Sequence, residues 1–488
     1  MRSASVLSIA LLASLGLAAP PKNGPGSPAS IKNLKAKVKN VVHVVMENRS
    51  FDNLVGGQTF TKDIDTPANN GPFCNKVNTT DPHSKTYCTR ARDFDSIKDD
   101  PDHSVHGNNF QSYGTFHPVN EDVDSGKLIA NNKGFLEQHL RAHPKLTDPD
   151  YAAREVMAYY TPDQVPVVTT LCKEFVTFDK WHSCVPGPTN PNRMCIHTGT
   201  SGGRGTNDKT FDESTVTELS LFEQLSSQNI TWMNYDGTNG DFNSDAKFYN
   251  WTIATGKDKT NVRPLESFFQ DAYLGKLPQY TFINPSCCGL DTNSMHPTGP
   301  ISTGEVFLKQ IYDAVRNSPQ WDNMLLVITF DEAGGFYDHN APPKAVRPDK
   351  LTYTEATPDG STYTLNFNRY GGRIPTWIVS PYLEKGHVEH EGVNSAGKTE
   401  IYSATSVLRT LGYLWDFEPF TQGHVEHEGV NSAGKTEIYS ATSVLRTLGY
   451  LWDFEPFTPR VEASPSFDHL FQKKRTNTPK VMPNPKPF

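Results

Sequence analysis

Side chains able to bind a metal ion follow two apolar runs of the chain, MLLVITF at residues 324–330 and VVHVVM at residues 41–46. Runs of this length, rich in β-branched residues, are typical of strands buried on both faces of a parallel sheet. In open α/β sheets, ligands bind beyond the carboxyl ends of the strands. The polar residues at those ends are Glu47 and Asn48 after the earlier run, and Asp331 and Glu332 after the later one. Three carboxylates and an amide oxygen suit one divalent metal ion. The alternative for Asp331 and Glu332 is a solvated acidic turn.

A hydroxyl group lies in a rigid turn elsewhere in the chain, at Thr189 within PGPTNPNR (residues 186–193). Prolines and a glycine fix that backbone, and metal coordination can activate a hydroxyl as a nucleophile. His103 and His296 could donate to phosphoryl oxygens or protonate a leaving group. Arg193 could bind a phosphate through two hydrogen bonds. These residue types predict phosphoryl transfer, with Thr189 as the nucleophile and as a ligand of the metal.

Each of these residues also has a purely structural interpretation. Thr189 would then be an ordinary turn residue, His103 a surface partner of the preceding acid, and His296 a loop histidine before a proline. Asp338 and His339, which follow two glycines after the second apolar run, would only cap a turn. The joint occurrence of these side chains at strand ends favours a functional site.

The elements that must position these residues alternate along the chain between strands and helices. Further short strands are expected at residues 175–178, 231–235, 279–283 and 376–380, and a helix at residues 216–226. Ser302 and Glu305 match a capping box that opens another helix, and Phe307, Ile311 and Val315 recur on one face of it. This alternation predicts a three-layer α/β/α sandwich with a mostly parallel central sheet.

The chain of 488 residues carries a net charge of −8, which gives no electrostatic case for binding nucleic acid. Residues 1–19 match a secretory signal peptide, with Arg2 before an apolar stretch and a small-residue cleavage site. We therefore expect a secreted, extracellular protein with no transmembrane segment. Residues 20–37 are expected to be a flexible leader, residues 38–472 a single domain, and residues 473–488 a disordered tail.

Two further features fit a secreted chain. Glycosylation sequons begin at Asn78, Asn229 and Asn250. Seven cysteines leave at least one unpaired within a monomer, and Cys74 and Cys88, which would close a short loop, are the first expected disulfide.

A segment of 36 residues occurs twice without a single difference, as residues 386–421 and 423–458. Repeats of solenoid proteins diverge in sequence and usually occur in three or more copies, so this repeat indicates either a very recent duplication or an erroneous gene prediction. We expect only one copy to pack in the native position. The sequence leaves open which one does.

Five motifs, in this order, resemble the phosphoesterase family, which holds bacterial-type phospholipases C and related acid phosphatases; fungal secreted members are the most similar. The motifs are ENRSFD (47–52), DPDHS (100–104), PGPTNPNR (186–193), HP (296–297) and DEAGGFYDH (331–339). The resemblance implies an alkaline-phosphatase-like fold and a covalent phospho-enzyme beside a bound metal.

Carried over residue by residue, the resemblance makes Thr189 the nucleophile and places His103 and His296 toward the phosphate. Glu47, Asn48, Asp331 and Glu332 match the metal shell, and Asp338 and His339 match a motif that we assign, with Arg193, to substrate binding.

The expected activity is therefore a phospholipase C that acts on glycerophospholipids. An acid phosphatase that acts on small phosphomonoesters is the alternative. A catalytically inactive secreted or cell-surface binding protein stays open as a third hypothesis, because an insertion of this size could block folding.

Overall fold

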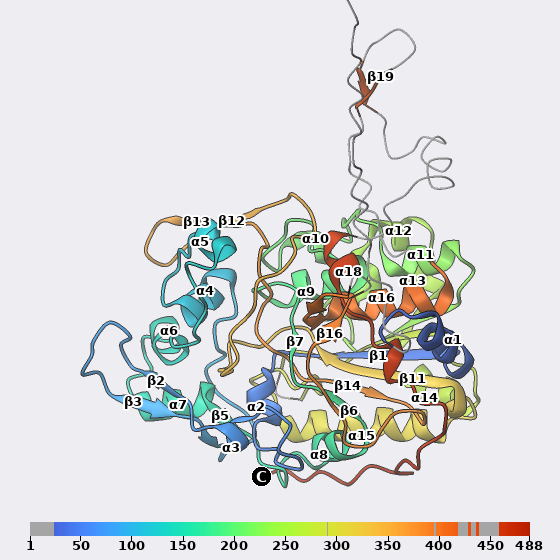
Figure 1. Cartoon of the computed structure of the whole chain (residues 1–488), viewed down its shortest axis with the longest axis horizontal. Helices are drawn as coiled ribbons and strands as arrows, with labels where there is room; N and C mark the ends of the chain where they lie inside the picture. The colour runs from blue at the N-terminus through green and yellow to red at the C-terminus, as the bar shows by residue number, and fades with distance from the viewer. Residues whose placement is uncertain (1–23, 290, 395–396, 418–427, 431–435, 439–457) are drawn as a thin grey trace, which may run out of the picture.

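A computed structural model describes residues 24–289, 291–394, 397–417, 428–430, 436–438 and 458–488 (Figure 1). Its centre is an eight-stranded sheet with the order β15-β6-β14-β11-β1-β10-β8-β9. The strands are β15 (Val388–Glu389), β6 (Val176–Phe178), β14 (Thr376–Val379), β11 (Met324–Phe330), β1 (Asn40–Met46), β10 (Tyr280–Asn284), β8 (Trp232–Asp236) and β9 (Val262–Pro264). Only β14 runs antiparallel to its neighbours β11 and β6, and all the other pairs in this sheet are parallel. The predicted mostly parallel α/β sheet is confirmed.

Helices cover both faces of the sheet (Figure 1). Below it in the view lie α8 (Pro166–Glu174) and α15 (Ile301–Asn317), which contact each other. Above it lie α9 (Thr189–Thr198), α11 (Leu221–Ser227) and α16 (Ala404–Trp415), with α9 in contact with both others. The layers are therefore α/β/α, as predicted.

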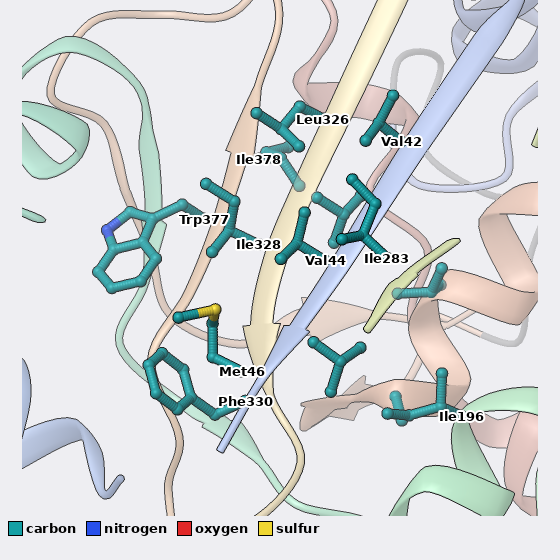
Figure 2. Close-up of a cluster of buried hydrophobic side chains, with 14 of the residues drawn as sticks. Val42, Val44, Met46, Ile196, Ile283, Leu326, Ile328, Phe330, Trp377 and Ile378 are labelled. Atoms are coloured by element: carbon teal, nitrogen blue, oxygen red, sulfur yellow. The ribbon is translucent and has the colours of Figure 1, made fainter. Parts of the chain in front are cut away.

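The apolar strand residues form the main core (Figure 2). Val42 and Val44 of β1 lie beside Leu326 and Ile328 of β11, and Trp377 of β14 extends the cluster. All five side chains are fully buried. This burial on both sides of the sheet explains why β1 and β11 read as continuous apolar runs.

The start of α15 differs from the predicted capping box. The helix begins at Ile301, so Ser302 lies inside its first turn and donates to Asp95 instead. Glu305 accepts from the backbone N–H groups of Val167 and Val168 at the start of α8. Glu305 thus satisfies the free donors of a different helix. The predicted apolar face of α15 is buried as expected.

Residues 51–159 form a smaller lobe of short elements beside the strand ends. They are α2 (Phe51–Val55), α3 (Pro67–Asn70), β2 (Cys74–Lys76), β3 (Thr86–Cys88), β4 (Arg90–Ala91), α4 (Val105–Tyr113), α5 (Asn120–Ser125), α6 (Phe135–Ala142), α7 (Pro149–Val156) and β5 (Ala158–Tyr159). A separate small core, which includes Leu136 and Val156, holds part of this lobe together. Tyr337 joins that core and so ties the lobe to the loop after β11.

The remaining described elements are short. They are β7 (Trp181–His182), α10 (Lys209–Asp212), α12 (Asn250–Ala254), α13 (Lys257–Thr260), α14 (Glu266–Tyr273), β12 (Tyr353–Ala356), β13 (Thr362–Leu365), β16 (Gly392–Val393), β17 (Thr399–Glu400), β18 (Tyr402–Ser403), β19 (Glu428–Val430), β20 (Thr436–Ile438), α18 (Pro459–Ala463) and the 3-10 turns η1 (Asp245–Phe248), η2 (Trp321–Asn323) and η3 (Asp468–Leu470).

Both ends of the described chain pack against the domain, contrary to the expected flexible leader and disordered tail. Helix α1 (Pro28–Lys37) is capped by Ser27 and buries Leu34 against the main core. In the tail, Met482 is buried, and the carbonyl of Pro479 accepts from Tyr312 of α15. In each segment, the burial of one apolar side chain stabilises packing against the domain, although the segment as a whole is polar and rich in proline. The predicted signal peptide falls outside the described residues.

The first copy of the repeated segment occupies a place in the fold. Its β15 pairs with β6 and forms one edge of the sheet, its β18 pairs with β7, and its α16 packs on α9. Of the second copy, β19 and β20 form an antiparallel pair, and most of the rest lies outside the described residues.

The predicted Cys74–Cys88 disulfide is confirmed, and Cys184–Cys195 and Cys287–Cys288 are also bonded, which leaves Cys172 as a buried free thiol. Within the described ranges, no helix combines the length and apolar character needed to cross a bilayer.

Candidate active site

The pairing register of β1 with β11 brings the predicted metal ligands together. Met46 pairs with Phe330, so Glu47 and Asp331 are the first residues beyond two aligned strand ends. The backbone N–H of Asn48 donates to Asp331 Oδ1 across 3.1 Å. Glu47, Asn48, Asp331 and Glu332 are all at most 4% exposed. The four side chains predicted to bind the metal, which come from two distant segments, therefore lie in one buried place.

Several oxygens of this group have no hydrogen-bond partner among the described residues. They are Glu47 Oε2, Asn48 Oδ1 and Glu332 Oε1, and each is buried. Buried polar atoms are normally paired, because an unpaired one costs about 1–3 kcal/mol. Unpaired oxygens on three neighbouring side chains match the donor set of a hard or borderline divalent cation. The residues present therefore fit the predicted metal.

The backbone conformation around these residues lets neighbouring segments of the chain pack closely against each other. Asn48 has φ of 54°, in the left-handed region that Asn tolerates better than most residues. Gly334 has φ of 65°, and a Cβ there would lie 2.2 Å from the Asn48 carbonyl oxygen. Gly335 has φ of 67°, and a Cβ there would lie 2.7 Å from the carbonyl oxygen of Asp102, next to His103. The two glycines let the loop after β11 contact both neighbouring segments.

Two of the carboxyl groups have raised pKa values, because they are buried and lie close to another carboxyl group. Burial raises the pKa of Glu332 to about 8, with His103 opposing the shift and Asp331 adding to it. Burial also raises the pKa of Glu47 well above its usual value, with Arg193 opposing and Asp331 adding. Both groups would be stabilised as carboxylates by a nearby cation.

Arg193 is placed differently from the predicted phosphate-binding role. Its guanidinium donates to Glu47 Oε1 across 2.6 Å, to Asp331 Oδ2 across 3.2 Å and to Asp245 Oδ1 across 3.3 Å. The side chain is 3% exposed. With its donors directed at three buried carboxylates, Arg193 neutralises ligand charge from beneath the site, and we withdraw it as a substrate contact.

Thr189 is the first residue of α9, half-buried, where sequence analysis expected only a turn. Arg193 lies one turn later on the same face. Side chains of a helix point back toward its N-terminus, and the Arg193 guanidinium reaches Glu47 and Asp331. Thr189 therefore stands on the side of α9 that faces the carboxylates. Direct contact of Thr189 with a metal stays a prediction.

The turn before Thr189 is held by one side chain. Asn192 accepts from the backbone N–H of Val185 and donates to the carbonyls of Val185, Gly187 and Pro188. These bonds close the proline-rich turn onto the first turn of α9, where proline is tolerated. The backbone position of Thr189 is therefore fixed before any ligand binds.

The two predicted histidines approach two different carboxylates near the site. His103 Nε2 lies 4.0 Å from Glu332 Oε1, and His296 Nε2 lies 3.6 Å from Asp100 Oδ2. Burial alone would lower the pKa of His103, but Glu332 and Asp100 raise it to about 9. Burial lowers the pKa of His296, although Asp100 opposes this shift. The two histidines near the predicted ligands thus have pKa values that are shifted in opposite directions.

Asp338 and His339 belong to a separate ion network, and not to a free substrate surface. Arg373 donates to Asp338 Oδ1 across 3.0 Å and to Asp52 Oδ1 across 2.8 Å. His339 lies within 2.9 Å of both Asp52 and Asp65. Ligand atoms of Asp52, Asp338 and His339 converge within 4.8 Å, as they would around a metal. Arg373 already supplies the cation there, so we reassign this pair to fastening the loop after β11.

Sequence analysis assigned no role to several of the groups described above, among them Asp245, Arg373 and Asp100. Asp245 and Arg373 lie outside any motif, and Asp100 lies inside DPDHS but received no role. Each acts through an ion pair between segments far apart in the chain, a relationship that spacing alone does not reveal.

Comparison with known proteins gave matches over most of the chain. A family model described as Phosphoesterase family matches residues 38–418. Non-specific phospholipase C6 of Arabidopsis thaliana is 33% identical over 399 residues, covering 78% of this chain and 69% of the relative. Non-hemolytic phospholipase C of Burkholderia pseudomallei is 27% identical over 274 residues, covering 48% of this chain and 38% of the relative.

Among solved structures, an alkaline phosphatase superfamily protein from Vibrio parahaemolyticus is 12% identical, with a TM-score of 0.31, and covers 52% of this chain and 61% of that chain.

Proposed function

The chain belongs to the phosphoesterase family, and from this premise we propose that it is a secreted phospholipase C that hydrolyses glycerophospholipids through a phospho-threonine intermediate on Thr189. The observation that carries the proposal is the set of unpaired buried oxygens on Glu47, Asn48 and Glu332, gathered beyond the ends of β1 and β11. The names of the plant and bacterial relatives support a phospholipid substrate.

Glu47, Asn48, Asp331 and Glu332 would hold one divalent cation, together with Thr189. When bound, such an ion supplies positive charge that stabilises phosphoryl oxygens and an ionised hydroxyl. Arg193 donates hydrogen bonds to Glu47 and Asp331 beneath this place. In the proposal, the acceptors lie on one side of the substrate phosphate and the Thr189 hydroxyl at the start of α9 reaches it from the same side.

In the first step Thr189 Oγ1, which has lost its proton to solvent, forms a bond to phosphorus, and the bond from phosphorus to the glycerol oxygen breaks. His296 or His103 protonates that oxygen, so diacylglycerol leaves as a neutral alcohol. In the second step water attacks phosphorus, the Oγ1–phosphorus bond breaks, and the phosphorylated head group leaves. The proton of that water passes to a histidine, which restores the starting state.

Secretion is supported by the two disulfides that join non-adjacent cysteines and by the exposure of all three sequon asparagines, Asn78, Asn229 and Asn250. Asn48, which also precedes a matching Ser, is fully buried and is not available to a glycan.

One assay separates the candidate activities. Purified protein is tested against phosphatidylcholine, phosphatidylglycerol and p-nitrophenyl phosphate, with and without added divalent metal. Release of diacylglycerol that depends on metal and is lost in Thr189→Val supports the proposal. Turnover of p-nitrophenyl phosphate alone would favour the acid phosphatase, and no turnover of any substrate would favour a binding protein. Wild-type activity in Thr189→Val would refute the nucleophile.

A further inference from the structure

A pair of adjacent cysteines lies against the metal-ligand group, and the proposed mechanism does not use it. Cys287 and Cys288 are bonded to each other, with Cys287 half-buried and Cys288 exposed. One ligand atom each from Glu47, Cys287 and Cys288 lie within 4.8 Å of one another. The group formed by Asp52, Asp338 and His339 is the other set of described side chains with ligand atoms this close together.

The loop that carries the cysteines is fixed to the site at several points. Ser286 and Asn293 exchange hydrogen bonds across its base. The carbonyl of Ser294 accepts from the backbone N–H of Glu47 across 2.9 Å. His296 follows two residues later. These contacts fix the base of the loop beside Glu47 without involving either sulfur.

A second observation that points to a bound ligand comes from the Glu47 carboxylate. Its Oε2 is buried and has no partner among the described residues, while Oε1 is taken by Arg193. Two sulfurs and one carboxylate oxygen form a donor set for a thiophilic divalent cation, because thiolates select Zn²⁺ and similar soft ions over Mg²⁺ or Ca²⁺. The two cysteine sulfurs can bind such a cation only after the disulfide between them is reduced to thiols.

We propose that Cys287 and Cys288, once reduced, form with Glu47 a second site that binds a thiophilic divalent cation. Two equivalents of a small-molecule thiol, RSH, reduce the disulfide: the bond between the two cysteine sulfurs breaks, each sulfur gains a hydrogen, and RSSR forms. Binding of the cation then releases two protons from the thiols. The site shares Glu47 with the proposed catalytic metal, so occupation of one opposes occupation of the other. This last consequence rests on the proposed function, whereas the binding itself does not.

Other cysteines must be removed from the test. Cys74–Cys88 lies on an exposed hairpin and would also yield a dithiol, so the parent protein for the experiment is Cys74→Ser/Cys88→Ser. Cys184–Cys195 and Cys172 are at most 1% exposed and stay protected in the folded protein. The comparison variant adds Cys287→Ser and Cys288→Ser to that parent.

Both proteins are titrated with Cd²⁺, before and after treatment with a mild thiol, and the ultraviolet thiolate-to-cadmium absorption is recorded. The parent should gain about one equivalent of thiolate-bound Cd²⁺ after reduction and none before it, and the comparison variant none in either state. Glu47→Gln in the parent should weaken this binding by about tenfold. Glu355→Gln, which changes a carboxylate on the β12–β13 hairpin outside the set, should change it less than threefold.

Equal thiolate absorption in the parent and the comparison variant, or none in the reduced parent, would overturn the proposal. If the parent does not fold, the same titration of the unaltered chain with and without Cys287→Ser/Cys288→Ser gives the answer by difference. Because absorption reports binding, loss of phospholipase activity in Thr189→Val leaves this result unaffected, and the two proposals can fail separately.

Discussion

The Arg193 guanidinium lies 2.6 Å from the Glu47 carboxylate, and both side chains are at most 5% exposed. The same guanidinium pairs with Asp331. It also pairs with Asp245, so three buried carboxylates share one guanidinium, and Glu332 follows Asp331 in the chain. A divalent cation would offset this excess of buried acidic groups, which is a physical reason to expect metal dependence.

Removing Arg193 should be costly even without substrate. Arg193→Met should lower the free energy of unfolding by about 3–5 kcal/mol, because it leaves buried carboxylates without their partner. Chemical denaturation of the metal-free protein measures this loss. The control is Arg90→Met, whose ion pair with Asp150 is more than two-fifths exposed and should cost about 1 kcal/mol or less. Equal losses in the two variants would contradict the assignment of Arg193.

Metal affinity should depend on Glu332. Its Oε1 is buried and unpaired among the described residues, so Glu332→Gln should weaken the binding of Mn²⁺ by at least about tenfold, measured by calorimetry. Glu355→Gln alters a carboxylate on the β12–β13 hairpin, paired with His106, and should leave the affinity unchanged. Full activity after exhaustive chelation would refute the metal shell altogether.

The His339 network predicts a pH dependence of stability. Burial alone would lower the pKa of His339, but hydrogen bonds to Asp52 and Asp65 raise it to about 10. A histidine whose pKa is raised on folding contributes its full stabilisation below about pH 6.5, and this is lost as the pH rises through about 10.

His339→Gln should therefore lower the free energy of unfolding by about 1–3 kcal/mol at pH 6, and the difference from wild type should shrink by pH 10. Denaturation curves at both pH values test this. A raised KM for His339→Gln with unchanged stability would restore the predicted substrate role.

Sequence reasoning found the ligands because their positions follow from local patterns. The apolar run 324–330 forms a strand with the same bounds as predicted. Because β1 and β11 end at the same level of the sheet, Glu47 and Asp331 lie close together. It missed the role of Arg193, which depends on how α9 packs across the sheet. It also misjudged both ends of the chain, because composition does not reveal that one residue such as Leu34 or Met482 finds a place in the core.

The duplicated segment offers a matched pair of substitutions. Glu389 in the first copy accepts from Tyr402 and pairs with His387 and His469. Burial opposes ionisation of Glu389, but these partners lower its pKa to about 2, so its stabilising effect is present above about pH 4.5 and is lost as the pH falls toward 2.

Glu389→Gln should thus lower the unfolding midpoint at pH 7. Glu426→Gln, the same change in the same local sequence of the second copy, should not, because the place in the fold is taken by the first copy. Measuring the thermal unfolding midpoint of both variants tests this prediction. A larger loss for Glu426→Gln would show that the second copy packs natively.

The most direct test of the account is to trap the intermediate. Enzyme mixed with phosphatidylcholine and metal is quenched in acid within one turnover and digested, and the peptide that carries Thr189 is analysed by mass spectrometry. The account predicts a phosphorylated head group attached to Thr189, absent from Thr189→Val and from chelated enzyme. Turnover with no modified Thr189 peptide at any time point, or with the group on another residue, would contradict it.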